Sequence, residues 1–262
     1  MIKKLTEANG VQVELLLNHK PIENLFIRGC LDAYRYQDSD QLGWGDFDQD
    51  GKLRAVLWRA HTRFIPFSVG AYDAKGFAEI INAEQNRTML FGLESVVAPI
   101  APYLKRLTNR FDHLYFARCT RLADLTTSNK TDQINKLAPS EVERLAGLLD
   151  QIPEFQGSSA RIDAKRSDLE RGLSRCYCIN QNNQMVATAS TALENDHSAM
   201  ISAVGTHPNF TGQGLATICL AQLMRDVLSE GKSLYLFYDN PIAGKLYDKL
   251  GYQHVGRWLM YQ

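Results

Sequence analysis

The chain has 262 residues, of which 45% are hydrophobic and 22% charged, which is ordinary for a globular protein and excludes extensive disorder. Lys and Arg number 29, as do Asp and Glu, so the basic excess typical of nucleic-acid binders is missing and we expect no nucleic-acid partner. No run approaches the ~18 apolar residues of a membrane span, and the N-terminal segment lacks a signal-peptide core. These features predict a cytoplasmic protein with no membrane partner.

The five cysteines do not have the pattern of a secreted disulfide framework, because their number is odd and most are isolated. Cys176 and Cys178 alternate along a predicted strand and therefore face the same side. With no second Cys or His cluster nearby, we expect them to pack in the core and expect no metal site.

The first half combines strand and helix signals, and we expect an α/β domain over residues 1–127. A turn at Asp48–Gly51 separates strand signals around Gly43–Gly45 from a second strand-forming run, Leu53–Val69. Apolar spacing predicts a helix from Ala74, followed by a strand, a helix and a further strand over 113–119. The polar segment Thr126–Gln133 is the best linker candidate.

The second half, residues 128–262, opens with Ser140 and Glu143 at the spacing of a capping box. A basic helix is expected over about Ile162–Leu173, and turn-rich segments then separate three predicted strands, over 175–179, 185–193 and 199–206. The full order is helix, helix, three strands, helix, strand, helix. This order predicts an α/β sandwich, a mixed central sheet with helices on both faces.

A glycine-rich turn, containing Gly212 and Gly214, lies between the strand that ends at Thr206 and a helix that begins near Leu215. Glycines let backbone N–H groups approach an anion closely, and the helix dipole adds about half a positive charge there. A tight strand-to-helix turn explains an isolated Gly-x-Gly equally well. The P-loop pattern and the third glycine of the dinucleotide-binding fingerprint are both missing.

A short C-terminal helix carries a candidate catalytic tyrosine. Asn240 is suited to cap this helix and Gly251 to end it. Between them four residues share one face, at i, i+3, i+4 and i+7: Ala243, Leu246, Tyr247 and Leu250. Tyr247 is either a core aromatic residue or a functional acid.

Three segments in this order resemble the GNAT superfamily of acyl-CoA-dependent N-acetyltransferases: Val204–Pro208, the loop Thr211–Ala216, and the pattern Asn240-x-x-Ala-x-x-x-Tyr-x-x-Leu-Gly-Tyr252. The combination covers about fifty residues, and it is more specific than the glycine-rich loop or the tyrosine-containing helix alone. At lower specificity the resemblance reaches back to about Ser140. In length and layout the first half is similar to the degenerate first copy of a tandem GNAT protein.

The resemblance implies acetyl-CoA as a co-substrate, with no metal. The pantetheine arm would pair with the strand Ala203–Thr206 as an added strand, and the pyrophosphate would lie on N–H groups of the glycine-rich turn. The implied cofactor-binding residues are Ala203, Val204, Gly205, Thr206, Thr211, Gly212, Gln213, Gly214, Leu215, Ala216, Thr217, Asn240, Ala243 and Tyr247.

The resemblance also implies direct attack of a neutral amine on the thioester, with a strand N–H near Val204 stabilising the oxyanion. Tyr247 would protonate the departing thiolate, a general-acid role worth about 10²- to 10⁴-fold.

The chain departs from the family pattern at two places. The first position of the pyrophosphate motif falls on Asn209 or Thr211, neither of which is basic or Gln, so phosphate binding relies more on backbone amides. The glutamate base of histone-type members falls on Ser198. The candidate bases near it are Glu194, Asp196 and His197, and a water relay without a dedicated base is an alternative.

We therefore expect transfer of acetyl from acetyl-CoA to a primary amine of a small molecule or peptide, in a ternary complex of a monomer or homodimer. The alternative is a non-catalytic acyl-CoA-binding regulatory module, and aminoacyl transfer is a third reading. The first half is a candidate for a pocket wall or dimer surface. Its aromatic residues Trp44, Trp58 and Phe64 either line such a pocket or pack in the core.

Overall fold

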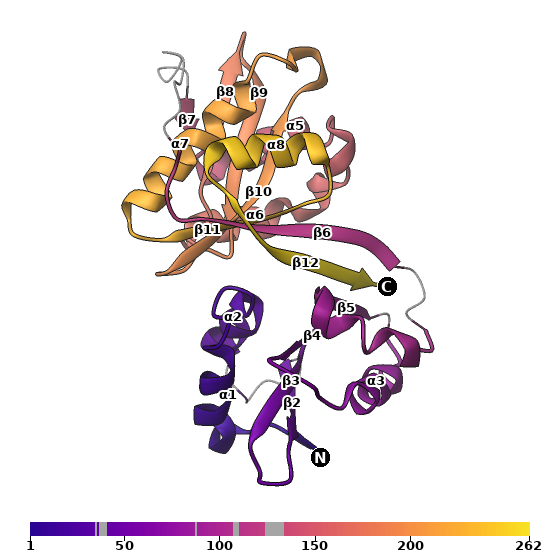
Figure 1. The fold of residues 1–262 in the computed structure, drawn as a ribbon. Coiled ribbons are helices and arrows are strands. Elements are labelled where there is room, and N and C mark those ends of the chain that lie inside the picture. Colours follow the sequence, from indigo (N-terminus) through magenta and orange to yellow (C-terminus); the bar gives the residue numbers. More distant parts are fainter. Residues whose placement is uncertain (35, 37–40, 87, 107–109, 124–133) are drawn as a thin grey trace. The chain divides into compact units, whose positions relative to one another are not determined.

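The computed structural model describes residues 1–34, 36, 41–86, 88–106, 110–123 and 134–262. The chain forms two compact units (Figure 1), of which unit 1 comprises Met1–Tyr115 with Gly256–Gln262 and unit 2 comprises Phe116–Val255. The final strand of the chain thus ends in unit 1. The expected linker over 126–133 and the expected division at 127/128 lie outside the described residues.

Unit 1 is built on a mixed sheet in which five strands are followed by the end of the last strand of the chain. The first four strands pair with one another in antiparallel fashion. Strand β5 is parallel to β4, and β12 is antiparallel to β5. The strands, in sheet order, are β1 (Ile2–Lys4), β2 (Gln41–Phe47), β3 (Leu53–Ala60), β4 (Arg63–Ser68), β5 (Met89–Leu93) and β12 (Gln253–Tyr261). The helices are α1 (Gly10–Leu17), α2 (Leu25–Tyr34), α3 (Ala74–Ala83) and α4 (Glu94–Val97), with 3₁₀ turns η1 (Glu7–Asn9) and η2 (Ala101–Tyr103).

The core of unit 1 forms where α3 packs on strands β3, β4 and β5. Phe77 and Ile81, on successive turns of α3, join Phe64 and Leu90 in one buried cluster. The long strand-forming run predicted by the sequence divides at His61, whose positive φ of 53° turns the chain between β3 and β4. Trp58 is also fully buried, so it and Phe64 have the packing role.

Unit 2 has a sheet of the same design, with the order β7-β8-β9-β10-β11-β6. Strands β7 to β10 are antiparallel to their neighbours and β11 is parallel to β10. The strands are β6 (Arg110–Cys119), β7 (Ile134–Lys136), β8 (Cys176–Gln181), β9 (Gln184–Ala192), β10 (Ser198–Thr206) and β11 (Ser233–Tyr238). The helices are α5 (Val142–Leu149), α6 (Ile162–Glu170), α7 (Leu215–Ser229) and α8 (Pro241–Leu250), with 3₁₀ turns η4 (Pro139–Glu141), η5 (Pro153–Phe155), η6 (Ser158–Arg161) and η7 (Pro208–Phe210).

Helices cover both faces of the unit 2 sheet, as predicted. Cys176 and Cys178 of β8 lie in the hydrophobic cluster beneath α5. Tyr177, between them, points to the other face and donates a hydrogen bond to Asp226 of α7. The paired cysteines therefore share a face and pack in the core, and burial raises the pKa of the Cys178 thiol to about 12.

The predicted capping box at Ser140 and Glu143 is wrong. The chain enters α5 through the 3₁₀ turn η4, which begins at Pro139. The Glu141 carboxylate, not that of Glu143, accepts a hydrogen bond from the backbone N–H of Ala138, at 3.2 Å. The reason is the proline at the first position of the turn, which favours an N-cap at Ala138, two residues earlier than the Ser-x-x-Glu spacing indicates.

The two units repeat one order of elements. Each has an antiparallel strand, two helices, three further antiparallel strands, a helix, a parallel strand and a short helix. The strand beside β5 in unit 1 is the C-terminal β12, whereas β6, which follows the first set of elements in the chain, lies beside β11 in unit 2. The repeat units thus exchange their last strands.

Candidate functional site

Strand β10 carries a bulge at its centre. Ser202 pairs with Ser190 of β9 and Gly205 with Thr188, so three steps on β10 match two on β9. The extra residue is accommodated at Ala203, which has a positive φ of 50°. A bulge leaves backbone groups unpaired and redirects them, so this point of the strand is open to another chain or ligand.

Strands β10 and β11 part at the same place. Their parallel pairing runs from Ser198 with Ser233 to Met200 with Tyr235 and goes no further. Strand β10 continues for six residues to Thr206, and β11 for three to Tyr238. The facing edges beyond Met200 therefore present backbone donors and acceptors that an extended ligand can pair with, in the manner of an added strand.

The glycine-rich turn follows directly from β10. Gly212 and Gly214 have positive φ values of 77° and 72°, a conformation that glycine adopts without steric cost. Gly214 is the N-cap of α7, and the first backbone bond of the helix is Ile218 N–H to the Gly214 carbonyl, at 3.0 Å. The N–H groups of the turn before Ile218 thus precede the helical ladder, as an anion site requires.

His207 fixes the junction between β10 and this turn. Its Nδ1 accepts a hydrogen bond from the backbone N–H of Asn209, at 3.1 Å, so Nε2 carries the proton and donates to Gln151 Oε1, at 2.7 Å. Gly205 lies so close beneath Ile152 that a Cβ would approach the Ile152 side chain to 2.6 Å. A larger residue at Gly205 would therefore displace the end of the Ile152 side chain.

Tyr247 lies on α8 next to the end of β11. Its ring centroid is 5.4 Å from that of Tyr238, the last residue of β11, and 5.7 Å from that of Tyr252. Burial, and secondarily Tyr238, raises the pKa of Tyr247, which stays protonated at neutral pH. Although the residue is 9% exposed, no hydrogen bond joins its hydroxyl to another residue of the described part of the chain.

Asn240 and Gly251 bound α8 as the sequence predicts. The Asn240 side chain accepts the N–H of Ile242 at 2.9 Å, and Gly251 ends the helix with a φ of 97°. Tyr238 packs so closely on Gly244 that a Cβ there would meet the Tyr238 ring at 2.6 Å. Gly244 thus sets how near α8, and with it Tyr247, comes to the end of β11. Ala243, the preceding residue, is half-buried.

A cavity of about 360 Å³ opens between α5, α6 and the face of β9 and β10. It reaches Ser202 and Ala203, the residues of the bulge. Most of its wall is apolar, formed by Val142, Leu145, Ala146, Leu149, Phe155 and Ile162. A small amphipathic molecule fits this combination of size and lining.

Lys165 is a half-buried cation that lines this cavity. Its ammonium group donates to Ser174 Oγ at 2.5 Å and to the Thr191 carbonyl at 3.2 Å. Burial lowers the pKa of Lys165 from its ordinary range. Sequence reasoning assigned this helix only a basic character and missed Lys165, because nothing in the local pattern distinguishes a lysine that turns inward from solvated ones.

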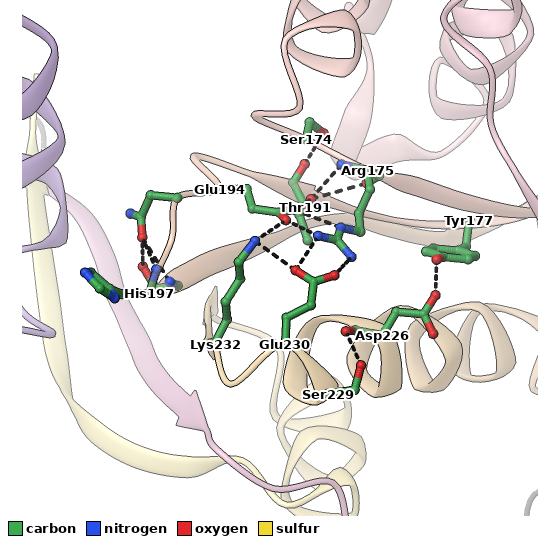
Figure 2. Close-up of polar contacts among 12 residues, drawn as sticks. Ser174, Arg175, Tyr177, Thr191, Glu194, His197, Asp226, Ser229, Glu230 and Lys232 are labelled. Atoms are coloured by element: carbon green, nitrogen blue, oxygen red, sulfur yellow. Dashed lines mark hydrogen bonds and ion pairs between the residues drawn. The ribbon is translucent and has the colours of Figure 1, made fainter.

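Glu194, a candidate base, instead belongs to a buried ion-pair cluster. Figure 2 shows it facing Arg175 and Lys232, with Glu230 beside both cations. Its side chain is 3% exposed, and the Lys232 ammonium lies 3.0 Å from its carboxylate. Burial by itself raises the pKa of Glu194, but the hydrogen bonds of Arg175 and Lys232 outweigh this and lower it. A carboxylate so held is a poor proton acceptor, and we assign Glu194 a structural role.

His197 and Asp196 are exposed in the turn before β10. The His197 backbone N–H donates to Asn195 Oδ1 at 2.9 Å, which closes the turn. His197 precedes Ala203 by six strand residues, about 20 Å at ~3.3 Å per residue. A general base has to come within about 3 Å of its proton or act through one water. The structure therefore separates His197 from the bulge, and it cannot serve there as a base.

Two further properties concern metals and membranes. The described residues contain no group of three or more His, Cys, Asp or Glu side chains arranged to hold a metal ion. Over the same residues, every helix is too short or too polar to cross a bilayer.

Comparison with known proteins finds a family model that matches the part of the chain containing this site. Residues 168–261 match a family model described as GNAT acetyltransferase. This segment contains the bulge, the parted strands, the glycine-rich turn and Tyr247. No curated protein matches the chain by sequence.

Solved structures of GNAT proteins share the fold over the whole chain. An acetyltransferase of the GNAT family from Colwellia psychrerythraea has a TM-score of 0.62 at 12% identity, over 100% of this chain and 98% of that chain. A GCN5-related N-acetyltransferase from Kribbella flavida has a TM-score of 0.64 at 15% identity, over 92% and 93%. A tandem GNAT protein from the clavulanic acid biosynthesis pathway has a TM-score of 0.57 at 12% identity, over 100% and 98%.

Proposed function

We propose that this chain, whose residues 168–261 match the GNAT acetyltransferase family model, transfers the acetyl group of acetyl-CoA to a primary amine of a small molecule or peptide. The observation that carries the proposal is the parting of β10 and β11 at the Ala203 bulge, followed directly by the glycine-rich turn. Strand β10 thus offers an unpaired edge, and the N-cap of α7, Gly214, follows eight residues after the end of the strand at Thr206.

Acetyl-CoA fits this element in one direction. Its pantetheine amides pair with the free edge of β10 from Ala203 to Thr206. The pyrophosphate then reaches the backbone N–H groups of Thr211–Thr217, where the positive φ values of the two glycines point the backbone outward without a side chain in the way. Asn209 and Thr211 add no charge, so the backbone amides and the helix dipole supply the attraction.

The reaction needs three events at the thioester. The nitrogen of a neutral amine forms a bond to the carbonyl carbon, and the resulting oxyanion accepts a hydrogen bond from a backbone N–H near Val204. The carbon–sulfur bond then breaks, and Tyr247 gives its hydroxyl proton to the thiolate. The ammonium loses its proton to water, and solvent returns a proton to Tyr247.

Tyr247 suits the acid role because its proton is retained at neutral pH and its hydroxyl has no competing acceptor among the described residues. The base role stays with a water relay, since Glu194 is held in the ion-pair cluster and His197 is remote from the bulge. The cavity beneath α5 and α6 opens at the bulge and is the proposed acceptor site.

A thiol-release assay tests the proposal. The purified full-length chain is incubated with acetyl-CoA and a panel of primary amines, and free CoA is measured with a thiol reagent. Amine-dependent CoA release with at least one acceptor is expected, together with a stoichiometric N-acetyl product detected by mass spectrometry. Tight acetyl-CoA binding without turnover across the panel would contradict catalysis and assign the chain a non-catalytic acyl-CoA-binding role.

A further inference from the structure

The acceptor cavity carries an excess of positive charge. Three charged side chains line it, the cations Arg161 and Lys165 and the acid Asp168. No ion pair joins Lys165 to a carboxylate within the described residues, and its two hydrogen-bond partners, Ser174 Oγ and the Thr191 carbonyl, are neutral. Asp168 offsets only part of the charge of the two cations, and a half-buried cation with no ion-pair partner favours an anion that supplies one.

Lys165 also has a donor to spare. An ammonium group carries three N–H donors, and Ser174 and Thr191 occupy two of them. These two partners are themselves fixed, because Ser174 is 5% exposed, Thr191 is fully buried, and the Ser174 hydroxyl donates to the same Thr191 carbonyl. The third donor is therefore held in a defined place in a cavity that Lys165 lines.

The distance from Lys165 to the bulge limits the size of the acceptor. Thr191, whose carbonyl binds Lys165, lies opposite Ile201, two residues before Ala203. Two residue steps amount to about 7 Å along the strand. A charge-assisted hydrogen bond takes up about 2.8 Å of this span. The remainder suits a molecule whose anionic group and amine are separated by one or two carbons.

We propose that Lys165 is a specificity-determining residue that anchors the carboxylate of the acceptor, so that the acceptor is an amino acid with an apolar side chain. This inference rests on the proposed function, because the amine must face the thioester at Ala203. The apolar wall from α5 and α6 receives the side chain, and Lys165 receives the carboxylate. A carboxylate is planar and compact, which matches one fixed N–H donor beside an apolar wall.

Binding of two product-like probes tests the anchor directly. N-acetyl-L-leucine and N-acetyl-L-leucinamide differ only in a carboxylate and a carboxamide, and each is titrated by calorimetry into the full chain saturated with CoA. The carboxylate is expected to bind about tenfold to a hundredfold more tightly, because hydrogen bonds between charged groups are stronger than neutral ones. Equal affinity for both probes, or no binding of either, overturns the anchor.

A pair of variants localises the effect. Lys165→Met keeps the apolar stem of the side chain and removes the charge, and it should abolish the preference for the carboxylate while leaving acetyl-CoA affinity unchanged. Lys136→Met removes an equal charge from an exposed residue of β7 and should keep the preference. If Lys165→Met retains the preference for the carboxylate, the assignment is overturned. If Lys165→Met does not fold, Lys165→Arg is used instead. It keeps the charge but changes the position of the donors, so it should retain only part of the preference, and an unchanged preference would overturn the assignment.

Turnover separates this inference from the proposed function. L-leucine and 3-methylbutylamine are compared as acceptors, with rates expressed per unprotonated amine. The wild-type chain should favour L-leucine by at least about tenfold. Equal rates would remove the anchor but leave acetyl transfer standing. Failure of the chain to bind acetyl-CoA would instead remove the proposed function, and the probe titration would then be repeated without CoA, where a preference for the carboxylate would still support an anion site at Lys165.

Discussion

The two units share one order of elements but differ at the point where a cofactor would bind. In unit 2 the β10–β11 pairing ends at Met200, just before the bulge, and β10 then leads into an eight-residue turn with two glycines in the left-handed conformation. In unit 1 the corresponding β4–β5 pairing also ends early, at Phe64 with Leu90, but the register of β3 and β4 is continuous from Ala55 with Ser68 to Ala60 with Arg63, so β4 has no bulge. The segment that joins β4 to α3 has five residues, and its glycine, Gly70, has no positive φ.

The helix N-termini differ in charge as well. The carboxylate of Asp73 caps α3 by accepting the N–H of Gly76 at 2.9 Å, and the N–H of Asp73 in turn donates to buried Asp46. An acidic side chain thus occupies the place where a pyrophosphate would lie, and it would repel one. Gly214 leaves the corresponding place open in unit 2. We therefore expect acetyl-CoA to bind unit 2 and not unit 1, although the two share one topology.

The largest expected effect comes from placing a charge in the open cradle. Gly214→Asp introduces a carboxylate among the N–H groups of the turn, and it should weaken acetyl-CoA binding by more than about 100-fold through repulsion. Aspartate tolerates the left-handed conformation comparatively well, so the fold should persist. Calorimetry measures the affinity.

Two control variants bracket this result. Gly214→Asn has the same shape without the charge and should weaken binding much less. Gly70→Asp makes the same kind of change in the segment before α3 of unit 1, where an added Cβ meets no atom within 4 Å, and should leave acetyl-CoA affinity unchanged. Loss of acetyl-CoA binding in Gly70→Asp would indicate that the cofactor binds unit 1 and would contradict the proposed site in unit 2.

The second effect is on turnover alone. Tyr247→Phe removes the proposed acid and should lower kcat by about 10²- to 10⁴-fold, while acetyl-CoA affinity stays within about twofold. Tyr252→Phe is the matched control. The Tyr252 hydroxyl is buried without a hydrogen-bond partner among the described residues, so its removal should not slow turnover. Equal rates for Tyr247→Phe and the wild-type chain would refute the acid assignment.

A third prediction concerns stability. Glu194→Gln leaves Arg175 and Lys232 short of their shared buried partner and should lower the free energy of unfolding by about 3–5 kcal/mol. Glu230→Gln affects a side chain that is 40% exposed and should cost no more than about 1 kcal/mol. Chemical denaturation of both variants gives the two values. If Glu194→Gln lowers the free energy of unfolding by less than Glu230→Gln does, Glu194 is not the main stabilising carboxylate of the cluster.

The smallest effect is on acid stability. The hydrogen bond from Arg175, with that from Lys232, lowers the pKa of Glu230 to about 2, and that of Glu194 is also lowered. Because both pKa values are below that of an unfolded glutamate, about 4.3, the stabilisation is complete above that pH. It should be lost as the pH falls from about 4.3 toward 2. Glu230→Gln should flatten this part of the stability profile, and an unchanged profile would show that Glu230 does not contribute.

The sequence predicted the parts of the site that depend on local backbone geometry. Gly212, Gly214, Asn240 and Gly251 occupy the turn and cap positions expected of them, because positive φ and capping are set by residue type over a few residues. The α/β class and the helices on both faces follow from periodicity in the same way.

The parts that depend on distant contacts were not predictable. Glu194 meets Lys232 only because the strand order places β9, β10 and β11 side by side, and Lys165 turns inward to Ser174, which precedes β8, and to Thr191 of β9. The Ala203 bulge has no signature in residue type, since alanine seldom adopts a positive φ. The exchange of β6 and β12 between the units likewise has no local signal.

The stoichiometry of acetyl-CoA binding tests the contrast between the units most directly. Calorimetric titration of the wild-type chain should give one site per chain, and Gly214→Asp should remove that site. Two sites per chain would show that the unit 1 copy is also open. A single site that persists in Gly214→Asp would show that acetyl-CoA does not bind at the parted strands of unit 2.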